Sequence, residues 1–336
     1  MTQFVSCERC KLSSLRGRSI LLVVFAVLLY PATSHAQTWT QDLPAESPSA
    51  RCCFSMAYDT SQFKLVLFGG VNGTGDLDHT FVWADANWTQ QDPAHSPTKR
   101  YLASMAYDAA DGKVVLFGGE TFTSGLRATH SDTWEWNGTD WKEEHPAKSP
   151  SARSSHAMAY DSVKSEVVLF GGYDANENPL NDTWVWKGSD WKQEHPANSP
   201  PARYIPGMAY DAAAGKVVLF GGLNSKGIVF GDTWVWNGTD WKQEHLANSP
   251  LARYSAAMAY DDASGQVVLF GGMDSAGNVL GDTWVWNGTD WKQEFFEDGP
   301  VARDGAGMAF DAAEGQVVMF GGVSIDAFLS DTWVWR

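Results

Sequence analysis

The sequence predicts an all-β fold, a six-bladed β-propeller of four-stranded antiparallel blades. A segment ending in a Gly-Gly pair recurs six times, at intervals of 49, 53, 50, 50 and 50 residues. Self-similarity at such a period is typical of propellers and solenoids. Two further observations support this fold: the strand pattern inside each repeat, and matching sequences at the two ends of the repeated region. The Gly-Gly pairs are Gly69-Gly70, Gly118-Gly119, Gly171-Gly172, Gly221-Gly222, Gly271-Gly272 and Gly321-Gly322.

The repeat at residues 203–250 shows the expected order of strands. Residues 208–211 end a first short apolar run, and residues 217–220 form a β-branched and aromatic strand that ends at the Gly-Gly pair. Residues 233–236 alternate Trp with Thr and Val, which places both indoles on one face of a third strand. An Asn-Gly hairpin signal then precedes Trp241, where a fourth strand begins. Each repeat is therefore expected to be a four-stranded meander, and no helical periodicity occurs after the N-terminal segment.

The two ends of the repeated region are complementary. The last repeat stops at Arg336, directly after its third strand, and so lacks a fourth. Residues 39–48 match residues 241–250 slot for slot, with Trp39 in the place of Trp241. We expect this N-terminal strand to complete the last blade, which fixes the blade count at six and leaves no exposed sheet edge at the seam.

The repeated pattern resembles a known family. It reads Arg…Met-Ala-Tyr-Asp…Val-Val-Leu-Phe-Gly-Gly…Asp-Thr-Trp-Val-Trp…Trp…Pro. This is similar to the Kelch repeat, whose signature is a Gly-Gly pair after the second strand followed by spaced aromatic residues. The resemblance covers residues 37–336 and implies a propeller. It leaves the function open, because Kelch propellers serve as protein-binding modules, as carbohydrate-linked enzymes and as structural domains.

The first 36 residues have the features of a secretory signal. A basic region precedes an apolar run at residues 20–30, and Ser34-His35-Ala36 is a small-x-small cleavage site. The apolar run is too short to span a bilayer comfortably, and no later stretch is long and apolar enough to do so. We therefore expect a signal peptide at residues 1–36 and a propeller at residues 37–336. The mature chain is expected to have no membrane span and to be secreted or periplasmic after cleavage near Ala36.

Charge and cysteine content narrow the possible partners. Residues 37–336 contain 20 Lys and Arg against 39 Asp and Glu, a net charge of −19. This balance argues against a nucleic acid or an anionic membrane as a partner, because binding phosphates needs a basic surface. The only cysteines in this range are Cys52 and Cys53. Adjacent cysteines can close only a strained ring, so two free thiols and a vicinal disulfide both remain open.

Comparison of the six copies separates scaffold from candidate site. All 17 tryptophans have a fixed slot: six open the fourth strands and eleven occupy the third strands, where Phe81 takes the remaining place. We therefore expect them in the core between blades and not on a sugar-binding platform.

One arginine begins each repeat, and we expect these six positions to converge on the axis. They are Arg51, Arg100, Arg153, Arg203, Arg253 and Arg303. One hypothesis is a cationic ring that binds an anion, such as a peptide carboxylate or an acidic sugar, through bidentate contacts. The alternative, which we favour, is that each arginine pairs with the Asp of the Asp-Thr-Trp segment or with loop carbonyls.

Immediately after each arginine the copies differ, which suggests the mouth of the central channel. Candidate ligand-binding residues at these positions are Tyr101, His156, Tyr204, Tyr254 and Asp304. The loops between second and third strands also vary, and in a propeller they share a face with the links from one blade to the next. Binding is therefore expected on this variable face, because the opposite face carries nearly identical turns.

We expect no metal and no cofactor. His145, His195 and His245 recur 50 residues apart, but they follow the outermost strand and diverge from the axis, whereas zinc needs convergent ligands. Copper-radical enzymes of the Kelch type need a cluster of Tyr, His and Cys. Because His156 is the only histidine expected on an inner strand, the sequence does not favour a copper-radical enzyme.

These observations favour a non-catalytic, exported and monomeric propeller that binds a protein or a glycan through its variable face. No nucleophilic triad, phosphate loop or carboxylate dyad is recognisable in the sequence. One alternative is an exported Kelch-type mutarotase or epimerase acting on an acidic sugar, with His156, Asp304 and the six arginines at the channel. A second alternative is a purely structural extracellular module.

Overall fold

A computed structural model describes residues 37–123 and 125–336, and these residues form one compact unit. The predicted signal peptide, residues 1–36, lies outside the described residues. The described part contains thirty strands and no helix. It accordingly has no helix with the length and apolar character needed to cross a membrane.

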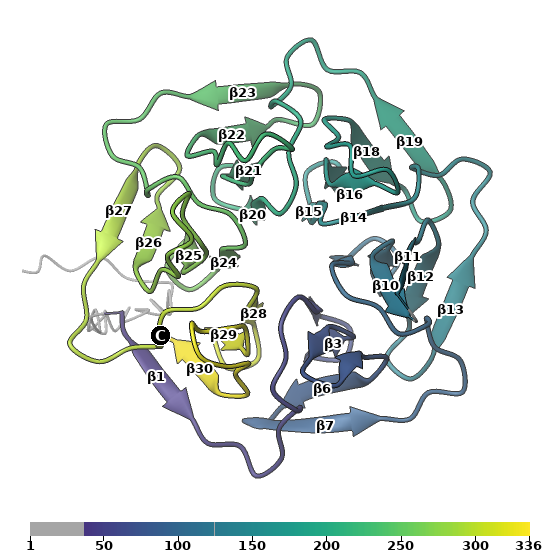
Figure 1. The fold of residues 1–336 in the computed structure, drawn as a ribbon, viewed down its shortest axis with the longest axis horizontal. Helices are drawn as coiled ribbons and strands as arrows, with labels where there is room; N and C mark the ends of the chain where they lie inside the picture. Colours follow the sequence, from purple (N-terminus) through teal and green to yellow (C-terminus); the bar gives the residue numbers. More distant parts are fainter. Residues whose placement is uncertain (1–36, 124) are drawn as a thin grey trace, which may run out of the picture. The chain divides into compact units, whose positions relative to one another are not determined.

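Six four-stranded antiparallel sheets are arranged around a central axis as the blades of a propeller, which confirms the predicted fold class (Figure 1). In each blade the first strand lies innermost and the fourth lies at the outer rim. The first strands of neighbouring blades contact one another around the whole circle, including the first strands of the first and last blades.

Each blade follows the meander order expected from the sequence. Blade 1 contains β2 (Ser55–Asp59), β3 (Lys64–Phe68), β6 (Thr80–Ala84) and β7 (Asn87–Gln91). Blade 2 contains β8 (Ser104–Asp108), β9 (Lys113–Phe117), β12 (Thr133–Trp136) and β13 (Trp141–Glu144). Blade 3 contains β15 (Ala157–Asp161), β16 (Glu166–Phe170), β18 (Thr183–Trp186) and β19 (Trp191–Glu194).

The second half of the circle has the same plan. Blade 4 contains β20 (Gly207–Asp211), β21 (Lys216–Phe220), β22 (Thr233–Trp236) and β23 (Trp241–Glu244). Blade 5 contains β24 (Ala257–Asp261), β25 (Gln266–Phe270), β26 (Thr283–Trp286) and β27 (Trp291–Glu294). Blade 6 contains β28 (Gly307–Asp311), β29 (Gln316–Phe320), β30 (Thr332–Trp335) and β1 (Trp39–Asp42).

The N-terminal strand closes the ring, as predicted. β1 pairs antiparallel with β30, with Trp39 opposite Trp335 and Asp42 opposite Thr332. Beyond this ladder, the backbone N–H of Thr38 donates to the carbonyl of Arg336 at 3.0 Å. The last blade therefore combines strands from the two ends of the described chain.

The core lies between blades, in six clusters of buried apolar side chains. The tryptophan that opens each fourth strand packs there. Trp141, for example, lies edge-on to Phe68 with ring centroids 5.3 Å apart, and its indole N–H donates to the Thr80 hydroxyl of the preceding blade at 2.9 Å. The same indole-to-threonine bond joins all six pairs of neighbouring blades. This confirms the expectation that these six tryptophans are core residues.

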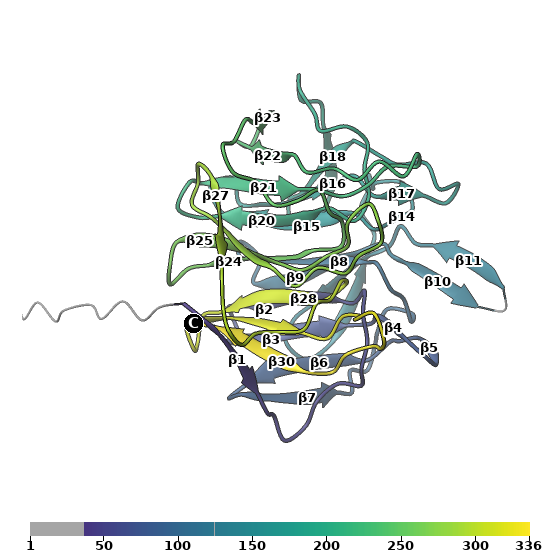
Figure 2. The same ribbon diagram turned by 60° about the vertical axis from the view of Figure 1, so that its left-hand side comes forward.

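Six minor strands, in three two-stranded pairs, lie at the ends of the blades. They are β4 (Val71–Asn72), β5 (Gly75–Asp76), β10 (Glu120–Thr123), β11 (Leu126–Thr129), β14 (Arg153–Ser154) and β17 (Tyr173–Asp174). All six lie on the same face of the propeller, and Figure 2 shows the β10–β11 hairpin extending furthest from it. The chain end at Arg336 lies at the opposite face (Figure 2).

Candidate functional site

The variable loops and the links between blades share one face. On this face, the residue after each repeat-opening arginine pairs with the residue after the Gly-Gly pair of the same blade. Tyr204, for example, exchanges two backbone hydrogen bonds of 3.0 Å with Leu223. We call this side the variable face; it is turned towards the viewer in Figure 1.

A closed ring of backbone hydrogen bonds surrounds the axis just inside the variable face. Each member donates its N–H to the carbonyl of the equivalent residue in the preceding blade, over 2.7 to 3.1 Å, and the sixth bond returns to the first blade. We call this the axial ring. Its members are Cys53, Leu102, Ser155, Ile205, Ser255 and Gly305.

The axial ring explains why its positions vary in sequence. All six residues have a positive φ, between 52° and 63°, although only one of them is glycine. This conformation costs a non-glycine residue roughly 1–2 kcal/mol, and the strain is greatest for a β-branched residue such as Ile205. Because the bonds use only backbone atoms, any side chain that tolerates this φ can occupy the position. Sequence variation here is therefore compatible with a purely structural ring.

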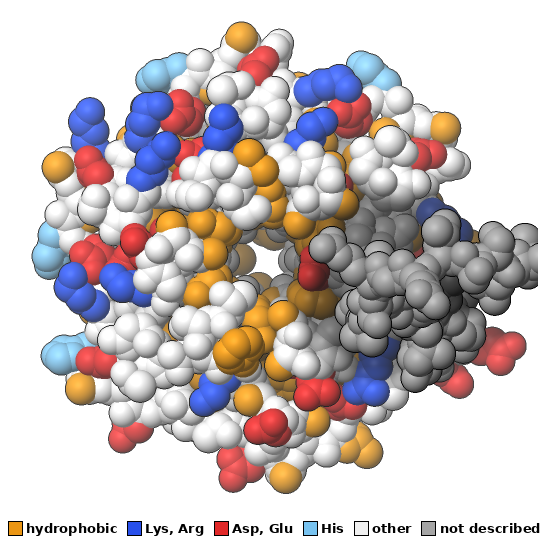
Figure 3. Space-filling view, turned by 180° about the vertical axis from the view of Figure 1, so that it is seen from behind, with side chains coloured by type: hydrophobic (Ala, Val, Ile, Leu, Met, Phe, Trp, Pro, Cys, Tyr) orange, Lys and Arg blue, Asp and Glu red, His pale blue; other side chains and the backbone are white. Residues whose placement is uncertain are grey.

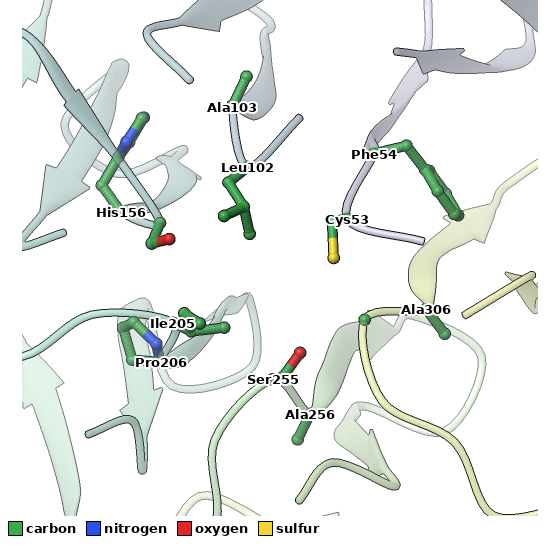
Figure 4. Close-up of a pocket in the computed structure, with 12 residues that line it drawn as sticks. Cys53, Phe54, Leu102, Ala103, His156, Ile205, Pro206, Ser255, Ala256 and Ala306 are labelled. Carbon is green, nitrogen blue, oxygen red and sulfur yellow. The ribbon is translucent and has the colours of Figure 1, made fainter. Parts of the chain in front are cut away.

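A small axial pocket of about 120 Å³ lies against this ring. Its wall consists of the axial ring and the residue that follows each member. Figure 4 shows side chains from different blades, including Cys53, Leu102 and Ser255, directed into this common space. On the opposite face the centre of the propeller is hollowed and surrounded by hydrophobic side chains (Figure 3).

The six repeat-opening arginines lie inside the blades, and each is at most 1% exposed. The Arg203 guanidinium donates to the carbonyls of Pro201 and Gly221 and forms a bidentate pair with Asp232 at 2.6 and 2.9 Å. In blades 2, 3, 5 and 6 the repeat-opening arginine pairs in the same way with the Asp of the Asp-Thr-Trp segment. The structure thus shows arginine–aspartate pairing in blades 2 to 6, the alternative that we favoured over an anion-binding ring. None of the six guanidinium groups borders the axial pocket.

These ion pairs perturb the carboxylates. Burial is the largest single influence and would raise the pKa of Asp232, but the hydrogen bond and charge of Arg203 together with the Trp234 hydrogen bond outweigh it, and the pKa is lowered. The indole N–H of Trp234 also donates to this carboxylate, at 2.7 Å. Asp232 therefore stays ionised and links the start of its repeat to the third strand, β22.

Blade 1 departs from this arrangement. His79 stands in the Asp slot and Phe81 in the following Trp slot. Within the described residues Arg51 has no ion pair; it donates to the carbonyls of Ser49 and Gly69 and lies over the Phe81 ring, 5.2 Å from its centroid. Burial lowers the pKa of Arg51 to about 10, so the guanidinium remains charged at neutral pH.

His156 is a buried wall residue. It borders the axial pocket, but it is only 4% exposed and both ring nitrogens are shielded from solvent. Its ring lies edge-on to Phe117, with centroids 5.5 Å apart. Burial, with a smaller contribution from the nearby Arg153 charge, lowers the pKa of His156 to about 3. The imidazole is therefore neutral at physiological pH and fills the same position as Phe54 of blade 1.

The other predicted residues lie on the variable face but separate into different environments. The Tyr254 hydroxyl contacts the sulfur of Met273 at 2.9 Å. Asp304 is partly buried, and burial raises its pKa although a hydrogen bond with Ser255 opposes the change. Burial and then a hydrogen bond with Glu120 raise the pKa of Tyr101.

Glu120 is the centre of a polar cluster that the sequence analysis missed. It is 3% exposed, and one carboxylate oxygen accepts hydrogen bonds from Arg127 at 2.7 Å, Ser154 at 2.9 Å and Tyr173 at 3.0 Å. The Arg127 guanidinium also lies over the Tyr173 ring, 4.6 Å from its centroid. We call these four residues the Glu120 cluster. With three donors on one oxygen, this carboxylate holds the surrounding side chains in place.

A pocket of about 270 Å³ opens beside this cluster on the variable face. It is lined by Arg127, Tyr173, Glu177, Tyr204 and Ser225, and we call it the variable-face pocket. The rings of Tyr173 and Tyr204 meet edge to face with centroids 5.1 Å apart. Glu177 is 74% exposed and accepts a hydrogen bond from Arg127 at 2.6 Å. The pocket thus combines the two tyrosine rings with the Arg127 cation, the exposed Glu177 carboxylate and the Ser225 hydroxyl.

One sequence signal could have revealed this cluster. The residue after the Gly-Gly pair is apolar or aromatic in the other five blades, whereas blade 2 has Glu120 there. Blade 2 also has the longest variable loop, which supplies Arg127 from β11. Of the predicted site residues, only Tyr204 lines the variable-face pocket.

No group of three or more His, Cys, Asp or Glu side chains is placed to hold a metal ion among residues 37–123 and 125–336. The exposed His145, His195 and His245 lie at the outer rim, as expected.

Comparisons with known proteins extend the fold assignment. No protein-family model matches the chain, and no curated protein matches it. Among solved structures, that of YjhT is similar, with a TM-score of 0.67 and 14% sequence identity over 86% of this chain and 95% of the other. At this level of identity the likeness shows a shared propeller fold and nothing more specific.

Proposed function

We propose that this chain is an exported Kelch-type propeller that acts as a non-catalytic binding module, with a glycan as its ligand in the variable-face pocket. The observation that carries the proposal is the pocket itself. Tyr204 and Ser225 have counterparts in blade 5, but Arg127, Tyr173 and Glu177 have none in the other blades, so the combination occurs once. The repeated arginines and tryptophans, in contrast, have structural partners. Binding on loops held by a rigid scaffold is a common arrangement.

The chemistry of the pocket favours a sugar over an extended peptide. A volume of about 270 Å³ lies just below the usual range for ligand sites, which begins at about 300 Å³, and suits a ligand as small as one or two sugar units. Tyrosine rings provide apolar surface for the face of a sugar ring. Arg127, Glu177 and Ser225 supply donors and acceptors for its hydroxyl groups.

A glycan array with paired variants tests the proposal. Tyr204→Ala should weaken glycan binding at least tenfold, a loss of about 1.4 kcal/mol. Tyr254→Ala is the matched control, because Tyr254 occupies the same position in blade 5 and contacts Met273 outside the pocket. Equal losses in both variants, or none in either, would contradict a glycan site in this pocket. If a protein is found to bind through the same residues and no glycan does, the ligand of the pocket is a protein.

A second candidate function is an exported mutarotase or epimerase acting on an acidic sugar. The Glu120 cluster favours it, because the Glu120 carboxylate accepts hydrogen bonds from the hydroxyls of Tyr173 and Ser154, a pairing that can relay a proton to a sugar ring oxygen. In this version Glu120 replaces His156 and Asp304. None of the three lines the variable-face pocket, but Glu120 accepts a hydrogen bond from Tyr173, which does. Magnetisation exchange between sugar anomers would detect catalysis, and Glu120→Gln should abolish it. Turnover in the wild type would overturn the non-catalytic proposal; no binding and no turnover would leave a structural module.

A further inference from the structure

The two adjacent cysteines of blade 1 lie at the junction of the axial ring and the variable face. Cys52 is buried, whereas Cys53 is partly exposed and directs its sulfur into the axial pocket (Figure 4). Their Sγ atoms are in contact, 2.9 Å apart, and both are free thiols. They are the only cysteines among the described residues.

The backbone that brings the sulfurs together is imposed by the propeller. Cys53 has φ of 59°, within the range of the other five axial-ring residues, and its N–H and carbonyl belong to that ring. Cys52 exchanges two backbone hydrogen bonds of 3.0 Å with Val71 in the first variable loop. Ser154 and Ser155 occupy the same two positions in blade 3. The contact between sulfurs therefore follows from placing two cysteines in a geometry that all blades share.

We propose that Cys52 and Cys53 are a reversible redox site that closes to a vicinal disulfide when a low-molecular-weight disulfide such as oxidised glutathione is present. The Cys53 thiolate attacks one glutathione sulfur, forming a mixed disulfide and releasing one glutathione. The Cys52 thiolate then attacks the Cys53 sulfur, closing the S–S bond and releasing the second glutathione. Two protein thiols are oxidised and one glutathione disulfide is reduced to two thiols.

Adjacency makes this bond a labile one. The Cα atoms of neighbouring residues are about 3.8 Å apart, below the usual span of a disulfide, and such strain makes the bond easier to reduce. The bond closes no chain loop, so it contributes little of the entropic stabilisation that longer loops give. A bond of this kind suits a reversible site better than a permanent crosslink.

The position of the pair gives the bond a structural consequence. Cys52 holds the first variable loop through Val71, and Cys53 holds blades 6 and 2 through Gly305 and Leu102. Closing the bond restricts the backbone between these two attachments. The redox state of the pair is thereby linked to the loop between β3 and β6.

The thiols are protected from rapid reaction. The hydrogen bond with Cys52 and then burial raise the pKa of Cys53, and the neighbouring Asp304 charge adds to the effect. Because the thiolate is the attacking form, the rate of closure should rise with pH above neutrality. The first step, attack by Cys53, is therefore slow near neutral pH, but the end point is the same.

Peptide mapping of the full chain tests the site. The protein is equilibrated with glutathione mixtures from fully reduced to fully oxidised, quenched with acid, alkylated and digested. The peptide holding both cysteines should lose two hydrogens in mass and become resistant to alkylation under oxidising conditions, and reduced glutathione should reverse both changes. Amide hydrogen exchange of residues 71–78 should slow in the oxidised protein.

The serine variants supply matched controls, because serine is the native residue at both positions in blade 3. Cys52→Ser should fold and form only a mixed disulfide between Cys53 and glutathione. The double variant Cys52→Ser/Cys53→Ser should show no redox dependence of hydrogen exchange. Wild-type protein that stays fully alkylatable, or that carries glutathione without closing the internal bond, would overturn the proposal.

Discussion

In blades 2 to 6 a buried arginine is acceptable because its charge and donors are all used inside one blade. Arg203 reaches two carbonyls and a carboxylate, and that carboxylate also accepts the Trp234 indole N–H. Blade 1 shows that these groups depend on one another. There His79 replaces the aspartate and Phe81, which has no N–H, replaces the tryptophan. The carboxylate acceptor and the indole donor that it serves are therefore absent together in blade 1.

Removing one arginine should therefore destabilise the fold without a specific loss of binding. Arg203→Ala leaves the partly buried Asp232 without its cation, and breaking such a pair costs about 3–5 kcal/mol. Arg253→Ala should have the same effect in blade 5. Urea unfolding gives the free energies, and glycan binding by the folded fraction should be unchanged. A variant with full stability and lost binding would return the arginines to the ligand site.

His156 should make the protein sensitive to mild acid. Its pKa is about 3 in the folded protein and about 6.5 when unfolded, so the unfolded chain binds the extra proton as the pH falls through this window. Stability from this residue is complete above pH 6.5 and falls by about 3 kcal/mol at pH 4. His156→Phe, which copies Phe54 of blade 1, should be about as stable as wild type at pH 8.

The measurement is the free energy of unfolding in urea at pH 8, 6 and 4. The curve of His156→Phe should be flatter than that of the wild type between pH 6.5 and 4, with similar values at pH 8. Parallel curves would mean that the imidazole becomes protonated in the folded protein. That outcome would contradict its burial as a neutral wall residue.

Residue roles were predictable where the six copies agree and unpredictable where they differ. Pairing of the arginines with aspartates followed from their joint recurrence. Glu120 and Arg127 occur once each, so no repeat could assign them, and their contact depends on the shape of the β10–β11 hairpin. Tyr204 and Tyr254 are equivalent in sequence, yet only Tyr204 borders the variable-face pocket, because the neighbouring loop supplies Tyr173.

At the scale of the element, the Gly-Gly turn lets two blades approach closely. Gly171 has φ of 68°, and a Cβ there would lie 2.7 Å from the Arg203 carbonyl oxygen of the next blade. The following Gly172 donates its N–H to that same carbonyl at 3.0 Å. The glycine pair thus provides both the turn conformation and the space for a link between blades.

Substitution of two glycines should separate these two requirements. Gly227 has a similar φ of 73° but no atom within 4 Å of an added Cβ. Gly227→Ala should therefore cost about 1 kcal/mol from backbone strain alone. Gly171→Ala adds a clash with backbone and should cost more than twice as much. Equal losses of unfolding free energy in urea would show that close approach is unimportant.

The axial ring is the element that sequence patterns could not reveal. Its hydrogen bonds join only backbone atoms, and its side chains range from glycine to isoleucine. Variation at these positions was interpreted as a sign of ligand binding at the channel mouth. The structure supplies another reason for the variation, because the ring constrains φ and leaves the side chain free.

At the scale of the whole molecule, the fold was predictable because it is encoded six times over. Strand order, blade count and closure each follow from a repeated or complementary pattern, and the structure confirms all three. The shape of the variable face was not predictable, since each loop there is unique and packs against loops from other blades. Asp76 of blade 1, for instance, accepts a hydrogen bond from the Phe122 backbone of blade 2 at 2.6 Å.

Closure by β1 makes one seam of the ring different from the other five. Trp39 and Trp241 occupy the same slot, and each donates its indole N–H to a threonine of the preceding blade at 2.9 Å. β23 is joined covalently to the ordered blades on both sides. Within the described residues, β1 is joined covalently only through its C-terminal end, so its packing must hold the other end in place.

Trp39→Ala and Trp241→Ala should therefore lose similar packing energy but fail differently. Each truncation of a buried tryptophan costs about 3–5 kcal/mol. In Trp241→Ala the loss should lower global stability, because β23 is connected at both ends to ordered strands and cannot detach without disturbing them. In Trp39→Ala, β1 can detach from β30 while blades 1 to 5 remain folded, a local opening of low free energy. Limited proteolysis under native conditions should cut Trp39→Ala near residues 39–48 and leave Trp241→Ala intact at residues 241–250. Equal cutting in both variants would show that the seam is no weaker than any other blade.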